Sequence, residues 1–131
     1  SELRRRGIDV IVHTILCLPG ETKPDILQTI QYLNRQDIQG IKLQLLHILK
    51  GTDLAEIYAS DPFPVPDPQE YYELLGACIS HLRPDIVIHR LTGDGPKELL
   101  TAPLWTCNKR QVLNQLQSYF KTHDIWQGKE Y

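Results

Sequence analysis

Residues 13–22 read HTILCLPGET and show which class of structure the chain adopts, because a strand pattern runs directly into a helix start. The apolar segment 8–16 is typical of a strand buried on both faces, and a Pro-Gly turn follows it. Thr22 and Asp25 then form a capping-box pattern for a helix. In parallel α/β sheets such a turn lies at the carboxyl end of the strands, where ligands bind. The stretch therefore indicates a ligand-binding loop, and an ordinary strand–turn–helix connection is the alternative.

The segments after this stretch repeat the alternation of strands and helices. A second strand is predicted at 41–49 and a third at 85–91, with a capped helix at 67–82 between them and a last helix from Asn108. A short helix is expected at 53–59, a proline-rich loop at 61–68 and a long non-periodic stretch at 92–108. Strands joined by helical crossovers of this length run parallel, so the fold class is α/β. A closed (β/α) barrel typically needs about 250 residues, so this chain would form roughly half of one.

Composition and charge narrow the classes of function. The 131 residues are 41% hydrophobic and 23% charged, with a formal net charge of −2, which gives no overall bias toward nucleic acid or anionic membranes. No apolar run approaches the ~20 residues of a membrane span, and no signal-peptide pattern opens the chain. The three cysteines are widely spaced and include no CxxC pair. We therefore expect a cytoplasmic protein without disulfides, metal ligands or a membrane partner.

The amino-terminal residues read as the end of a helix. Residues 2–6 place arginines in a last helical turn, and Gly7 fits the position after it. The chain also contains no Met. From these features we expect this chain to be a piece of a longer protein. The first partner that we expect for it is the amino-terminal part of that same polypeptide.

Four blocks in this order and spacing resemble the carboxyl-terminal part of radical S-adenosylmethionine (SAM) proteins. They are HTILCLPGET at 13–22, GIKLQLLHILKGT at 40–52, IVIHRLTGDGPKELL at 86–100 and APLWTCNK at 102–109. The chain is most similar to a bacterial group labelled Fe-S oxidoreductase, which is related to the elongator catalytic subunit and to oxygen-independent coproporphyrinogen oxidase. The resemblance covers nearly the whole chain.

The resemblance implies a fold, cofactors and an activity for the longer protein. The fold is a partial (β/α)6 barrel similar to a TIM barrel, in which 1–60 would be the last barrel units and 61–131 a family-specific extension. The cofactors are SAM and a [4Fe-4S] cluster, which cleaves SAM reductively to a 5′-deoxyadenosyl radical that abstracts hydrogen from a substrate. The cluster-binding CxxxCxxC motif is absent from these residues. We therefore expect the 131 residues to hold neither cofactor and to be inactive alone.

The resemblance also assigns an adenine-supporting motif to the turn after the first strand. Its positions in this chain are Ile15, Cys17, Leu18, Pro19, Gly20 and Glu21. His13 stands where the family motif has its first glycine, and Cys17 stands where it has its second. A cysteine there is a departure, because glycine permits the closest approach of the backbone to a ligand.

Side-chain alternation along the strands supplies further candidates for contact with substrate. If Ile15 faces the barrel interior, His13 does too, and on the second strand Lys42 and Gln44 share one face. A wet barrel interior and a solvated sheet edge both explain these long polar side chains.

Three more candidates lie near strand ends. His47 either orients substrate or is a hydrogen-bonded core histidine. Arg90 and Asp94 either belong to a binding loop, as the neighbouring glycines favour, or form an ion pair that fixes a turn.

Two other interpretations of the whole chain are open. One is a non-catalytic binding or assembly module that docks RNA, if Arg4, Arg5, Arg6, Lys109 and Arg110 cluster in space. The other is a small flavodoxin-like fold, which would depart from the order of consecutive barrel strands. We also expect a homodimer of the chain, because half a barrel leaves two strand edges bare.

Overall fold

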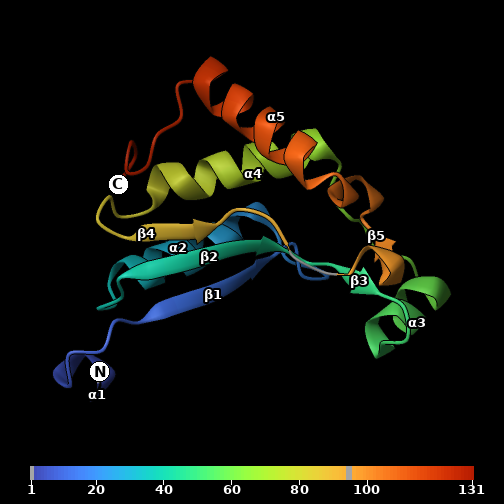
Figure 1. The fold of residues 1–131 in the computed structure, drawn as a ribbon, viewed down its shortest axis with the longest axis horizontal. Coiled ribbons are helices and arrows are strands. Elements are labelled where there is room, and N and C mark those ends of the chain that lie inside the picture. The colour runs from blue at the N-terminus through green and yellow to red at the C-terminus, as the bar shows by residue number, and fades with distance from the viewer. Residues whose placement is uncertain (1, 94–95) are drawn as a thin grey trace.

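The computed structural model describes residues 2–93 and 96–131 as a mixed α/β structure built on a parallel three-stranded sheet (Figure 1). The sheet consists of β1 (Ile11–Leu16), β2 (Gly40–Leu45) and β4 (Val87–Arg90), in the order β1-β2-β4. Ile11 pairs with Gly40 and Gly40 pairs with Val87, so the three strands start level with one another. The α/β class predicted from the sequence is confirmed, and these strands are neighbours in their chain order.

Helices cover one face of this sheet (Figure 1). α2 (Lys23–Asn34) connects β1 to β2, α4 (Pro68–His81) precedes β4, and α5 (Lys109–Thr122) follows β4 and packs against α4. Alternate strand residues point into a core shared with these helices. That core includes Leu16, Leu43 and Leu45 from the strands and Ile26, Ile30, Tyr71, Leu75 and Leu116 from the helices.

The opposite face of the sheet is exposed in the described structure. We call it the open face and define it by Ile11, His13, Ile15, Lys42 and Gln44. The parallel register places His13 beside Lys42 and Ile15 beside Gln44. The three β1 residues are exposed and the two β2 residues are half-buried, so the alternation along both strands is the predicted one.

Side-chain caps fix where the two longest connections enter their helices. At the start of α2 the Asp25 carboxylate accepts a hydrogen bond from the Thr22 N–H at 2.9 Å, and the Thr22 hydroxyl accepts one from the Asp25 N–H. At the start of α4 the Glu70 N–H donates to the Asp67 carboxylate at 2.8 Å, and Glu70 reciprocates. Both predicted capping boxes are therefore formed.

A second, smaller region lies beyond the carboxyl ends of the parallel strands (Figure 1). Its elements are β3 (Ile48–Leu49), α3 (Asp53–Ser60), β5 (Leu100–Ala102) and two 3-10 helices, η1 (Lys97–Leu99) and η2 (Leu104–Cys107). β3 and β5 pair antiparallel, and the Lys50 N–H continues the pairing by donating to the Leu99 carbonyl at 2.6 Å.

This region corrects two predictions. The single strand expected at 41–49 is wrong beyond residue 45, and the stretch 92–108 is not wholly irregular. The chain leaves the parallel sheet after Leu45 because β3 has a different partner, β5. That partner lies far along the sequence, so no local pattern could reveal the pairing.

The amino terminus begins with α1 (Glu2–Arg5), at the opposite end of the sheet from β3 and β5 (Figure 1). This short helix confirms the helical turn predicted there. None of the helices in the described part of the chain combines the length and the apolar character needed to cross a membrane. The parallel sheet takes β1 and β2 from residues before position 60 and β4 from residues after it. The domain boundary expected at residue 60 stays a prediction.

Candidate functional site

A carboxylate in the loop between β1 and α2 accepts hydrogen bonds from the backbone of the same loop. Glu21 Oε1 accepts hydrogen bonds from the backbone N–H groups of Cys17 and Leu18, at 3.1 and 3.3 Å. The backbone N–H of Glu21 in turn donates to the Leu18 carbonyl at 2.9 Å. Three of the residues predicted to contact the cofactor therefore belong to one hydrogen-bonded turn at the carboxyl end of β1.

The backbone of this loop explains why a glycine would suit position 17. Cys17 has a φ of 68°, in the left-handed region, and Gly20 has a φ of 79°. Residues with a Cβ atom avoid this region, and a cysteine held there costs about 1–2 kcal/mol. The departure from glycine at Cys17 is therefore accommodated with local strain.

The thiol of Cys17 is held in its neutral form. Burial raises the pKa of Cys17 from 9.0 to about 11, with smaller contributions from the carboxylates of Glu21 and Glu70. Because the thiolate is the nucleophile and the metal ligand, a thiol with this pKa is unreactive at neutral pH. Cys17 therefore acts as a half-buried neutral side chain.

Apolar and polar candidates meet where β1 and β2 end. Ile15 and Leu18 are 46% and 43% exposed, although both are large apolar residues. Ile15 lines a shallow hollow of about 190 Å³ together with Gln44 and His47. The structure thus brings together one residue of the predicted cofactor motif, one of the open face and the candidate histidine.

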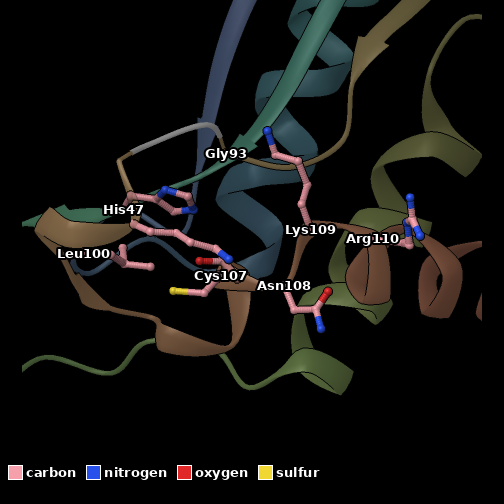
Figure 2. A pocket seen from close by; sticks show the side chains of 9 residues that line it. His47, Gly93, Leu100, Cys107, Asn108, Lys109 and Arg110 are labelled. Atoms are coloured by element: carbon pink, nitrogen blue, oxygen red, sulfur yellow. The ribbon is translucent and has the colours of Figure 1, made fainter.

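His47 lies in the turn between β2 and β3, where it lines two cavities. It lines the hollow with Gln44 and also a larger cavity of about 430 Å³ (Figure 2). Gly93 passes so close that a Cβ atom on it would lie 2.5 Å from the imidazole. A glycine at position 93 is therefore what allows the β4 loop to pack against His47.

The larger cavity was not anticipated from the sequence. Figure 2 shows His47, Leu100 and Cys107 on one side of it and Lys109 and Arg110, at the start of α5, on the other. The Lys109-Arg110 pair is visible in the sequence, but the segments that face it are brought there by the β3–β5 pairing. No sequence pattern pointed to Cys107 or to Lys97, which also lines this cavity.

Arg90 lies apart from the β1 loop. It lines a separate cavity of about 410 Å³ between β4 and α5, together with His89 and Lys109. Asp94, the other candidate of this segment, lies outside the described residues. The structure therefore does not join Arg90 to the group around Ile15 and Glu21.

The cations considered for RNA docking do not form one patch. The arginines at 4–6 make ion pairs with Glu2, Asp9 and Asp37 at the amino end of the sheet. Lys109 and Arg110 begin α5 near the opposite end (Figure 1). RNA docking stays a prediction, without the single basic surface that motivated it.

No set of metal ligands is found in residues 2–93 and 96–131. Within these ranges no three His, Cys, Asp or Glu side chains are placed to hold a metal ion.

A parallel sheet of successive strands, with a shaped loop at its carboxyl edge, is the architecture of β/α proteins, a class whose ligand sites typically lie at that edge. Residues 38–122 match the family described as Radical_SAM C-terminal domain. The chain therefore belongs to the radical SAM family and represents a carboxyl-terminal portion of it, as the sequence blocks predicted.

Curated relatives align with nearly the whole chain. YtqA of Bacillus subtilis is 35% identical over 129 residues, which are 98% of this chain and 40% of that protein. YhcC of Escherichia coli K12 is 32% identical over 122 residues, or 93% of this chain and 40% of YhcC. MJ0486 of Methanocaldococcus jannaschii is 30% identical over 132 residues, or 100% of this chain and 41% of MJ0486. The chain thus spans about two fifths of the length of these relatives.

A solved structure shares the fold. Elp3 of the archaeon Methanocaldococcus infernus, with residues 1–46 deleted, superposes with a TM-score of 0.77. The match covers 95% of this chain and 29% of the Elp3 chain, at 14% sequence identity. At that identity the likeness concerns the fold alone.

Proposed function

We propose that the chain forms the carboxyl-terminal wall of a partial (β/α)6 barrel in a radical SAM enzyme of the Fe-S oxidoreductase type. One observation carries the proposal: in a radical SAM family chain, the Glu21-held loop ends β1 directly beside the open face. The sequential order β1-β2-β4 supports the barrel, because neighbouring barrel strands follow one another in the chain. In this arrangement the open face lines the barrel interior and α2 and α4 lie outside.

The residues of the β1 loop fit the adenosyl part of SAM. Ile15 and Leu18 offer exposed apolar surface to an aromatic base, and the backbone of the same loop turns at Cys17 and Gly20, both with positive φ. When bound to its iron–sulfur cluster, SAM supplies the radical that abstracts hydrogen from the substrate. We assign the cluster to the remaining part of the longer protein, because the described residues offer no ligand set for it.

The polar residues of the open face lie where they could contact a substrate in the barrel interior. His13 and Lys42 are paired across the strands, and Gln44 follows on the same face. Their hydrogen-bonding groups would orient a substrate in the barrel interior, while His47 approaches from the carboxyl end. The chain spans two fifths of its relatives, so we propose the activity for the longer protein and none for these residues alone.

Replacing Leu18 tests the cofactor role. In the full-length protein, reconstituted with iron and sulfide without oxygen, Leu18→Asp sets a carboxylate against the base. We expect the affinity for SAM to fall by about tenfold or more, and the release of 5′-deoxyadenosine with it. Equilibrium dialysis measures the affinity, and chromatography measures the product.

The matched control is Leu104→Asp, which places the same charge on another exposed leucine, in η2. This variant should bind SAM like the unaltered protein. If both variants keep the same SAM affinity, the β1 loop does not hold the cofactor.

A further inference from the structure

Two cavities at the start of α5 share Lys109 in their lining and are both lined by basic residues. The cavities measure about 430 and 410 Å³, and Lys109 lines both. We call their union the basic groove. Its cationic side chains and histidines come from the β2–β3 turn, β4, η1 and α5, and are His47, His89, Arg90, Lys97, Lys109 and Arg110.

The lining of the basic groove is one-sided in charge. Among the described residues, neither cavity is lined by an aspartate or a glutamate, although the whole chain carries a net charge of −2. Asp94 belongs to the same segment in sequence and lies outside the described residues; counting its charge against the lining cations still leaves a positive excess. Lys97 and Arg110 make no ion pair within the described part of the chain. Lys97 and Arg110 thus bring two like charges to this lining without an ion-pair partner among the described residues, and an anionic ligand would stabilise them.

The form of the groove adds donors of two further kinds. The side-chain amide of Asn108 lies in the lining of the larger cavity, where the Thr106 hydroxyl already donates to the Pro103 carbonyl at 2.8 Å. The amino end of α5, a helix of 14 residues, contributes the positive end of its dipole. Figure 2 shows the Lys109 side chain extending from this helix start toward Gly93.

We infer that the basic groove binds phosphate groups of a phosphorylated ligand at the carboxyl end of β4. Arginine recognises phosphate oxygens through its planar fork, and lysine contributes a point charge. Two cavities joined at Lys109 suit a diphosphate, or two successive phosphates of a nucleotide chain. The inference goes beyond the proposed function and does not depend on SAM cleavage, since the lining alone carries it.

Pyrophosphate is the probe that tests this inference. The full-length protein is titrated with inorganic pyrophosphate by calorimetry, in the absence of SAM, at low and at high salt. The variant Lys97→Ala/Arg110→Ala should bind pyrophosphate at least about tenfold more weakly, because it removes two charge-assisted hydrogen bonds to the phosphate oxygens. The charge-keeping variant Lys97→Arg/Arg110→Lys should retain most of the affinity.

The matched control removes the same charge outside the groove, in the variant Lys50→Ala/Lys121→Ala. Both residues are exposed, and Lys121 lies at the far end of α5. The inference is overturned if pyrophosphate does not bind, or if the control loses as much affinity as the groove variant. A single-stranded RNA oligonucleotide and a nucleoside diphosphate, used as competitors, distinguish a polynucleotide source of the phosphates from a small-molecule one.

Discussion

At the scale of single residues, Cys17 shows most clearly how sequence and structure constrain each other. A cysteine occupies a left-handed position at the carboxyl end of β1, and the Glu21 carboxylate fixes the two amides around it. The sequence could identify this position as a departure from glycine. It could not reveal that the reason lies in φ, because the conformation depends on the closed loop.

The strain at Cys17 predicts an inverted order of stability between two substitutions. At ordinary positions alanine is more stable than glycine by roughly 0.5–1 kcal/mol. At φ 68° we expect Cys17→Gly to have a higher free energy of unfolding than Cys17→Ala, by about 1 kcal/mol. Urea denaturation of the two variants measures the difference. The same two substitutions at Cys107 serve as the control, and there the alanine variant should be the more stable one. If the alanine variant were also the more stable one at Cys17, the backbone at that position would not be strained.

The raised pKa of Cys17 predicts the pH dependence of its chemistry. Because the folded pKa is about 11 against 9.0 unperturbed, the folded state keeps its proton where the unfolded state loses it. Stability from this group is therefore complete below pH 9.0 and is lost as the pH rises toward 11. Alkylation of Cys17 by iodoacetamide, followed by mass spectrometry, should accelerate through the same range. If the alkylation rate reached half of its maximum below pH 9.0, Cys17 would not be held as a neutral thiol.

At the scale of elements, helix starts were predictable and strand ends were not. The capping boxes at Thr22 and Asp67 are local, so the residues that make them are adjacent in sequence. The end of β2 depends on β5, a distant partner, and the sequence therefore predicted one strand where the structure has two. The cavity beside α5 was missed for the same reason, since its walls meet only through that pairing.

Arg83 joins elements at the amino ends of the strands. Its guanidinium donates to the carbonyls of Asn34, Gln36 and Ile38 at 2.7, 3.1 and 3.0 Å, and thus holds the end of α2 and the entry to β2. Removing it leaves these carbonyls without their donor. We expect Arg83→Ala to lower the free energy of unfolding by about 3 kcal/mol.

Arg35→Ala is the control for Arg83→Ala, because Arg35 is an exposed arginine at the end of the same helix. It should change stability by no more than about 0.5 kcal/mol. Chemical denaturation compares the two variants. Equal losses would show that the Arg83 hydrogen bonds do not couple α2 to β2.

At the scale of the whole molecule, half of the sheet surface has no cover within the described residues. The helices bury one face, while the open face and the outer edge of β1 are left exposed. The sequence allowed this arrangement to be expected, because a βα repeat of this length is too short to close. Which residues would line the open face also followed from alternation along β1 and β2. The basic groove did not, since its lysines and arginines come from separate segments.

The bare edge of β1 predicts self-association of the 131-residue chain when it is expressed alone. Light scattering over a range of concentrations should show a dimer, formed by pairing of β1 edges beside the open face. Ile11→Lys places a charge on that face and should favour the monomer, whereas Ile57→Lys, on exposed α3 surface, should not. A monomer at every concentration would contradict the prediction.

The position of the cofactor is the central claim, and photoaffinity labelling tests it most directly. The full-length protein is irradiated with an azido-adenine analogue of SAM, digested, and mapped by mass spectrometry. We predict that the label attaches within the loop from Ile15 to Glu21 and that excess SAM prevents it. Labelling that is protected by SAM but confined to segments outside this loop would contradict the account.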